Sequence, residues 1–116
     1  MFIAMNRFRI GAGHEEAFER RWRERNSRLA EVPGFERFWL LRGAPLPEGG
    51  AEFVSMSQWA DQAAFVTWTG SEAFRQVHGS GGPPPSGMYL GAPQFTGYEV
   101  AIAESRAPEA RSGSEQ

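Results

Sequence analysis

A single amide stands where it could do chemistry on an otherwise apolar face. Asn6 lies in an alternating segment, on the side that also carries Phe2, Ala4, Phe8 and Ile10. A buried amide without a hydrogen-bond partner costs about 1–3 kcal/mol, so something must satisfy it. Two interpretations stay open: a bond to nearby backbone, which is the commoner arrangement, or a bond to a ligand.

Two further side chains are candidates for a site. His78 ends the segment SEAFRQVH, beside a loop rich in Gly and Pro. The chain has no Cys, so a metal must bind through His or carboxylate, and a neutral imidazole is a suitable axial ligand. A lone His is more often a surface residue, and His14, among glutamates, is expected to be solvated. Trp68 follows Phe65 at a spacing that packing onto a sheet would also explain.

Composition narrows the classes of protein that these residues can serve. The 116 residues suit one domain, with 41% hydrophobic and 22% charged side chains. Twelve basic side chains, all Arg, face fourteen acidic ones, which gives no footprint for nucleic acid. No apolar run approaches the roughly 20 residues of a membrane span, and no signal peptide is recognised at the start. We expect a cytoplasmic protein with no membrane partner.

The elements that position the candidates can be predicted from periodicity. Residues 2–10 alternate as a strand, and apolar side chains recur at helical spacing over 14–32, up to Pro33-Gly34. Residues 35–42 predict a strand that is apolar on both faces, with Phe35, Trp39 and Leu41 on one and Phe38 and Leu40 on the other.

A second half follows the turn-rich GAPLPEGGA. Residues 52–59 predict a third strand, after which Asp61 and Ser71 are expected to cap two short helices. Residues 79–93 form a Gly- and Pro-rich loop, long enough to suggest a function. A last strand is expected over 94–103. Residues 104–116 lack apolar periodicity and predict a disordered tail.

This order of elements predicts one domain over residues 1–103, an α+β ferredoxin-like βαββαβ fold with an antiparallel sheet. The helices would cover one face of the sheet. Large apolar side chains, Trp39 and Leu41 among them, remain for the other face. An apolar patch of that size predicts a symmetric homodimer that pairs sheet against sheet.

Several segments together resemble the haem-degrading monooxygenases, the IsdG-like branch of the antibiotic-biosynthesis monooxygenase superfamily. They are MFIAMNRFRI, the helix ending in EVPGF, the strand end LLRG, and the pattern W-x5-F-x2-W-x2-SEAF followed by His78. The resemblance covers roughly residues 1–103. Its specific part is the Asn, Trp and His constellation, which falls on Asn6, Trp68 and His78.

The resemblance implies a homodimer forming a dimeric α+β barrel, with haem (iron-protoporphyrin IX) in each subunit as both substrate and cofactor. His78 would be the proximal ligand to iron, Asn6 would donate a hydrogen bond on the distal side, and Trp68 would press the macrocycle out of plane. Ring cleavage with dioxygen would also need an external electron donor, a reductase or a small reductant that the sequence does not identify.

Other residues are secondary candidates for the haem pocket. Arg21 and Arg25, one helical turn apart, are expected to share one side of the helix. From there either could approach a propionate or a distal water, or simply pair with Glu on the surface. Trp22 belongs to the same stretch. Phe74 would wedge the helix that carries His78 or stack near the porphyrin. Met88, Tyr89 and Leu90 could cover the haem edge or merely anchor the loop 79–93.

Two other functions remain open at this point. A related enzyme could oxidise a small aromatic without a cofactor, in which case His78 would be incidental. A non-catalytic haem carrier would need only His78 and an apolar slot, so it would leave Asn6 and Trp68 without a purpose.

Overall fold

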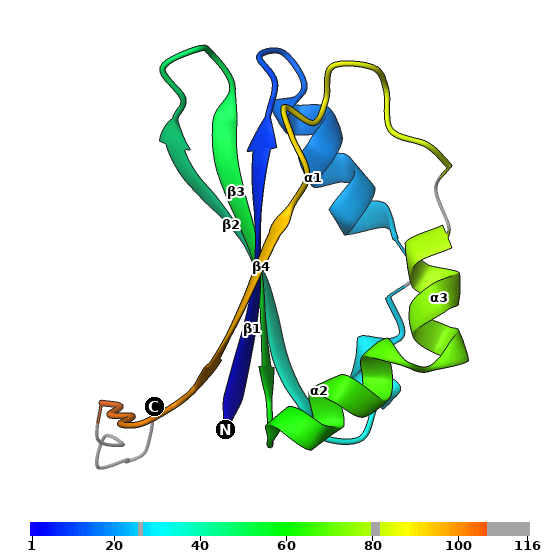
Figure 1. Ribbon diagram of the computed structural model, residues 1–116, viewed down its shortest axis with the longest axis vertical. Helices are drawn as coiled ribbons and strands as arrows, with labels where there is room; N and C mark the ends of the chain where they lie inside the picture. The colour runs from blue at the N-terminus through cyan, green and yellow to red at the C-terminus, as the bar shows by residue number, and fades with distance from the viewer. Residues whose placement is uncertain (26, 80–81, 107–116) are drawn as a thin grey trace, which may run out of the picture.

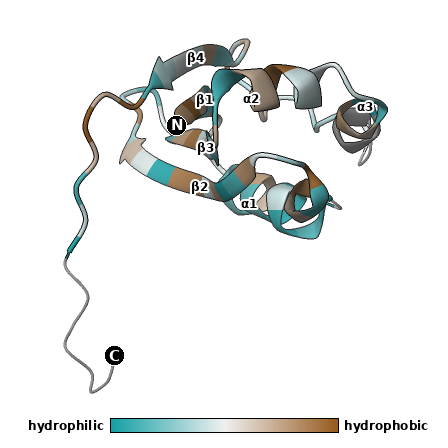
Figure 2. Cartoon of the chain, turned by 90° about the horizontal axis from the view of Figure 1, so that it is seen from below, coloured by the Kyte–Doolittle hydropathy of each residue, from teal (hydrophilic) through white to brown (hydrophobic). Residues whose placement is uncertain are grey.

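The fold is an antiparallel sheet covered on one side by helices, as shown by a computed structural model. It describes residues 1–25, 27–79 and 82–106, and for residues 76–79 it describes the backbone alone. The elements are, in order, β1 (Phe2–Ile10), α1 (Glu15–Glu24), the 3-10 turn η1 (Leu29–Glu31), β2 (Phe35–Pro45), β3 (Ala51–Trp59), α2 (Gln62–Thr69), α3 (Glu72–Gly79) and β4 (Gln94–Glu99). The strands lie in the order β2-β3-β1-β4, and the helices lie on one side of them (Figures 1 and 2). The predicted ferredoxin-like plan is confirmed.

The alternation of β1 divides the core into two clusters. Phe8 and Ile10 pack with Phe18, Phe53 and Met88 in one cluster. The other cluster contains Phe2, Ala4, Leu29, Trp59 and Trp68. Asn6 lies between the two on the same face of β1, because successive side chains of a strand alternate.

The first helix is shorter than its apolar period predicts, and the expectation of one helix over 14–32 is wrong. Arg25 already has an extended backbone, with ψ 149°, and Arg28 is left-handed, with φ 57°. Ser27 Oγ accepts a hydrogen bond from Leu29 N at 3.3 Å. Such a local bond competes with the helical ladder, so the apolar residues beyond it reach the core from a turn.

The second strand is longer than predicted, and one of its faces needs correction. Phe35 pairs with Trp59 and Arg37 with Gln58, so the register shifts between Phe35 and Arg37. This bulge turns Phe35 to the helix side, where it packs with Phe38 in the cluster of Trp59 and Trp68. Phe35 therefore does not share the face of Trp39 and Leu41.

The two predicted caps are confirmed. Asp61 Oδ1 accepts a hydrogen bond from Ala64 N at 2.8 Å at the start of α2. Ser71 Oγ accepts one from Phe74 N at 3.1 Å at the start of α3. These caps fix the bend between the two helices, which orients the side chains of α2 and α3 that face the sheet.

The far end of the Gly- and Pro-rich loop is anchored in the core. Met88 is fully buried, and its carbonyl accepts a hydrogen bond from Gly11 N at 2.9 Å. Leu90 N donates to Arg9 O at 2.9 Å. Burial raises the pKa of Tyr89, with Arg21 opposing the shift. For Met88 and Tyr89, the anchoring interpretation accounts for the contacts.

The last strand ends earlier than predicted. β4 stops at Glu99 instead of residue 103, because β1 has no residue left to pair with: Val100 N donates to Met1 O at 2.9 Å. Residues 100–106 form neither helix nor strand. Most of the predicted tail, 107–116, lies outside the described residues.

The sheet face opposite the helices carries a row of side chains that is apolar on β2, β3 and β1 and ends in a threonine on β4. The register places Trp39, Met56, Met5 and Thr96 side by side across the four strands. Leu41 and Tyr98 on the same face are 40% and 50% exposed in the single chain.

No helix in the described part of the chain is long and apolar enough to cross a membrane.

Candidate functional site

The candidate site is a cavity of about 200 Å³ between the sheet and the helices. It lies between the two core clusters, on the helix side of the sheet next to Asn6. Five of the candidates predicted from the sequence line it: Asn6, Trp22, Arg25, Trp68 and Phe74. The fold therefore brings together side chains from β1, the end of α1, α2 and α3.

Aromatic rings form most of the wall. Trp68 is 9% exposed. Its ring packs against Trp59 with centroids 5.4 Å apart and edge-on against Phe74 at 4.7 Å. Phe65 of α2 stacks on Phe95 of β4 at 5.6 Å, with 6° between their planes. Such walls suit a flat, apolar ligand.

Phe38, Phe65 and Phe95 were missed as site residues. A sequence pattern shows that an aromatic residue is apolar and periodic, but it does not distinguish a ring in the core from one lining a cavity. Phe95 is 52% exposed, although β4 looks like an ordinary alternating strand.

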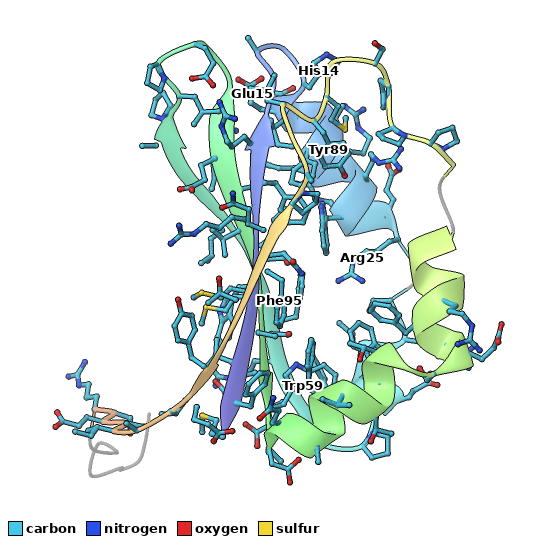
Figure 3. All side chains as sticks on the ribbon, viewed as in Figure 1. His14, Glu15, Arg25, Trp59, Tyr89 and Phe95 are labelled. Carbon is cyan, nitrogen blue, oxygen red and sulfur yellow. The ribbon has the colours of Figure 1, made fainter. Side chains whose placement is uncertain are left out.

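Arg25 extends from the end of α1 into the space between the sheet and α3 (Figure 3). Its guanidinium carbon lies 4.7 Å from the ring centroids of both Trp22 and Phe38, and those two rings stack at 5.5 Å. Among the described residues no carboxylate pairs with Arg25, and its Nε is buried without a hydrogen-bond partner. Burial lowers the pKa of Arg25. Since a guanidinium stays protonated, the cavity has a fixed positive charge at its side.

Arg21 does not share this position. Its Nη2 donates to Gly82 O at 2.9 Å and so ties α1 to the loop, whereas Arg25 turns into the cavity. The prediction that both arginines face one side assumed a continuous helix. The extended backbone of Arg25 separates them.

The floor of the cavity is polar where β1 and β3 pair. Asn6 lies opposite Ser55 in the register, and both line the cavity. Ser57, two residues along β3, accepts a hydrogen bond from Trp59 Nε1 at 2.8 Å. Ser55 was not singled out from the sequence, although the alternation of β3 places it on the helix side.

The histidines fall at different places. His78 lies in α3, but its side chain is outside the described residues, so its role as iron ligand stays a prediction. His14 precedes the first residue of α1, is half-buried instead of fully solvated, and does not line the cavity.

A second, wider groove of about 540 Å³ lies on the other side of Trp68. Its walls come from η1, the turn 32–34 before β2, and α2, with Val32, Pro33 and Ala64 among the apolar residues. Trp68 contributes to both hollows, so this indole is the partition between them.

With the geometry established, comparison with known proteins identifies the class. Residues 1–80 match the family described as antibiotic biosynthesis monooxygenase. The chain belongs to this family and is a monooxygenase of the α+β ferredoxin-like type.

Solved structures with the same fold serve different chemistries. A Bacillus cereus protein assigned to the antibiotic biosynthesis monooxygenases is 18% identical, with a TM-score of 0.72 over 93% of this chain and 98% of its own. The haem degrader MhuD from Mycobacterium tuberculosis, solved with two haems in its active site, is 24% identical, with a TM-score of 0.69 over 90% and 100%. SnoaB from Streptomyces nogalater, a cofactor-independent oxygenase solved as an N63A mutant, is 19% identical, with a TM-score of 0.64 over 88% and 94%. At these identities the likeness concerns the fold.

Proposed function

We propose that the protein is a haem-degrading monooxygenase, which binds haem in the cavity and cleaves the porphyrin ring with dioxygen and an external reductant. The observation that carries the proposal is the meeting of Asn6, Trp68 and Arg25 in one cavity, bordered by the helix that contains His78. Likeness in fold to the haem degrader MhuD supports it.

The described residues suit haem chemically. The aromatic wall suits a flat macrocycle, and the unpaired guanidinium of Arg25 suits a propionate. His78 would hold the iron through an imidazole nitrogen. Haem is the substrate, and its iron supplies the activation of dioxygen.

The protein's own groups would position the ring. Asn6 would donate a hydrogen bond from its amide to a group on the distal side of the haem. Trp68 would press the macrocycle out of plane, and such distortion is one way in which a protein tunes the electronic properties of haem. The surrounding rings, with Phe74, would exclude water. The cavity must widen to admit a macrocycle, since about 200 Å³ is below the roughly 300–1,000 Å³ of drug-sized sites. Among the described side chains of α3, Phe74 is the one that closes it.

The small cavity favours a second candidate function, oxidation of a small aromatic substrate without a cofactor. The fold of the cofactor-independent oxygenase SnoaB is compatible with it. In that case Arg25 would hold an acidic group of the substrate, and His78 would have no ligand role.

We also propose that the protein acts as a homodimer joined through the open sheet face. The row of Trp39, Met56 and Met5 would be buried against the same row of a second copy. Solution scattering is expected to give the mass of a dimer at micromolar concentration, and Met56→Glu is expected to give a monomer. A compact wild-type monomer would contradict this arrangement.

One experiment separates the candidate functions. Haemin added to the purified protein is expected to show a Soret band that is shifted and sharpened relative to free haemin, a change that the cofactor-independent enzyme would not require. A reductant added in air is expected to bleach that band, with an oxidised tetrapyrrole found by mass spectrometry. A shifted band that stays stable under these conditions would indicate a haem carrier, and a band unchanged from that of free haemin would end the haem proposal.

A further inference from the structure

Ser55 is an unexplained residue in the cavity floor. It is 6% exposed and is the one buried polar side chain in the described part of the chain. Within that part no hydrogen bond involves its hydroxyl. The side chain lines the cavity, so a hydroxyl with no protein partner leaves its hydrogen bond to whatever occupies that space, since the great majority of buried polar groups are satisfied. An alanine would fill the same place at lower cost.

The position of Ser55 shows where its hydroxyl can find a partner. Ser55 pairs with Asn6 on one side and with Leu40 on the other, so it lies in the middle of the sheet. Both Ser55 and Asn6 line the cavity. The amide of Asn6 likewise makes no hydrogen bond within the described residues. Two neighbouring polar groups therefore share the same open space.

Ser57, on the same face of β3 as Ser55, differs from Ser55 in having a hydrogen-bond partner for its hydroxyl. Its hydroxyl accepts the indole hydrogen bond of Trp59 at 2.8 Å, so it has a structural partner. Ser55 lies two residues earlier, in the middle of β3, and its hydroxyl has no hydrogen-bond partner within the described chain.

We infer that Ser55 and Asn6 form a polar subsite that holds one oxygen atom of a planar aromatic ligand. The Asn6 amide donates to this oxygen, and the Ser55 hydroxyl donates to it or accepts from it, which suits a hydroxyl or carbonyl oxygen. Phe65, Phe95 and Trp68 enclose the ring system next to it. The inference rests on the proposal that this cavity is the substrate site, and it deepens the second candidate function, a small aromatic substrate that carries a hydroxyl or carbonyl oxygen.

The test compares two probes, 1-naphthol and naphthalene, which differ by one oxygen atom. Calorimetric titration of the wild-type protein is expected to show tighter binding of 1-naphthol. In Ser55→Ala this preference should fall roughly 2- to 10-fold, the value of one neutral hydrogen bond, while naphthalene binds as before. Thr67→Ala, which removes a hydroxyl of α2 outside this cavity, should keep the preference.

Thermal unfolding without ligand gives an independent readout. Ser55→Ala is expected to unfold at the wild-type temperature or above, because no partner is lost. Ser57→Ala should unfold at a lower temperature, because Trp59 loses its acceptor. Ser55→Cys, which keeps the shape with a weaker hydrogen-bonding group, should lie near Ser55→Ala in its 1-naphthol preference.

Three results would overturn the inference: an unchanged preference in Ser55→Ala, a lowered unfolding temperature of that variant, or no binding of either probe to the wild-type protein. Each is distinct from failure of the haem proposal, which is decided by the Soret band of added haemin and by its bleaching with a reductant in air.

Discussion

Replacing Arg25 by Met should separate ligand binding from stability. The side chain stacks on Trp22 and Phe38 at 4.7 Å from each ring, and these contacts are worth about 0.5–1 kcal/mol each. Methionine keeps an unbranched stem on the same rings and regains about 0.3–1.5 kcal/mol through its sulfur. It also removes a partly buried charge that has no carboxylate partner among the described residues. We expect the free energy of unfolding to change by no more than about 1 kcal/mol.

The loss in binding should be larger. A hydrogen bond from a charged group contributes about 1.5–3 kcal/mol, so Arg25→Met should bind haemin about 10- to 150-fold more weakly. Haemin titration followed at the Soret band measures the affinity, and urea unfolding of the same preparation measures the stability.

Arg23→Met is the matched control. Arg23 lies in the last turn of α1, two residues before Arg25, is exposed, and pairs with Glu19 at 3.7 Å, a contact worth about 0–1 kcal/mol. It should bind haemin like the wild-type protein. Equal affinities of Arg25→Met and Arg23→Met would refute the role of Arg25 as an anion site, and a loss of several kcal/mol in the stability of Arg25→Met would show that it is structural.

Three further predictions concern His78, Asn6 and Tyr89. His78→Ala should abolish or greatly weaken ferric haem binding while the far-ultraviolet circular dichroism stays unchanged, and an unchanged Soret spectrum would point to another ligand. Asn6→Ala should bind haemin nearly as the wild-type protein does but degrade it more slowly, on the order of 10²-fold, and a destabilised but fully active variant would remove Asn6 from the mechanism. Burial raises the pKa of Tyr89, so the folded protein keeps a proton that the unfolded chain loses above about pH 10, and stability should fall as pH rises from there through the raised pKa. Tyr89→Phe should remove this part of the alkaline loss in urea unfolding, and an unaltered pH profile would contradict the assignment.

The sequence predicted the sheet well because each strand alternates with a period of two residues, and this alternation determines which side chains face the core. A slip by one residue in β1 would expose Phe2, Phe8 and Ile10 together, so the buried face of this strand was determined by the pattern alone. The caps of α2 and α3 were equally readable, since Asp61 and Ser71 stand immediately before the helices they cap.

The errors arose where local hydrogen bonds compete with periodicity. Leu29 and Val32 continue the apolar period of α1, but the bond from Leu29 N to Ser27 Oγ and the left-handed Arg28 end the helical path before them. The bulge after Phe35 is likewise invisible to a two-residue alternation. The break in α1 also matters for the site, since it sends Arg25 into the cavity and leaves Arg21 on the loop.

The cavity occurs at Asn6 because this residue lies between the two clusters of the hydrophobic core. The rows before and after it on β1 are apolar and belong to two separate clusters. An apolar pair at Asn6 and Ser55 would merge those clusters into one continuous core and would bury more apolar surface, which stabilises a fold by about 25 cal/mol per Å². The polar pair gives up that stabilisation at the centre of the sheet, beneath Trp68 and beside Arg25. The Asn6 amide and the Ser55 hydroxyl, which make no hydrogen bond within the described residues, thus share one cavity with the guanidinium of Arg25 and with aromatic walls. A planar ligand with oxygen and acidic groups would satisfy these polar groups together.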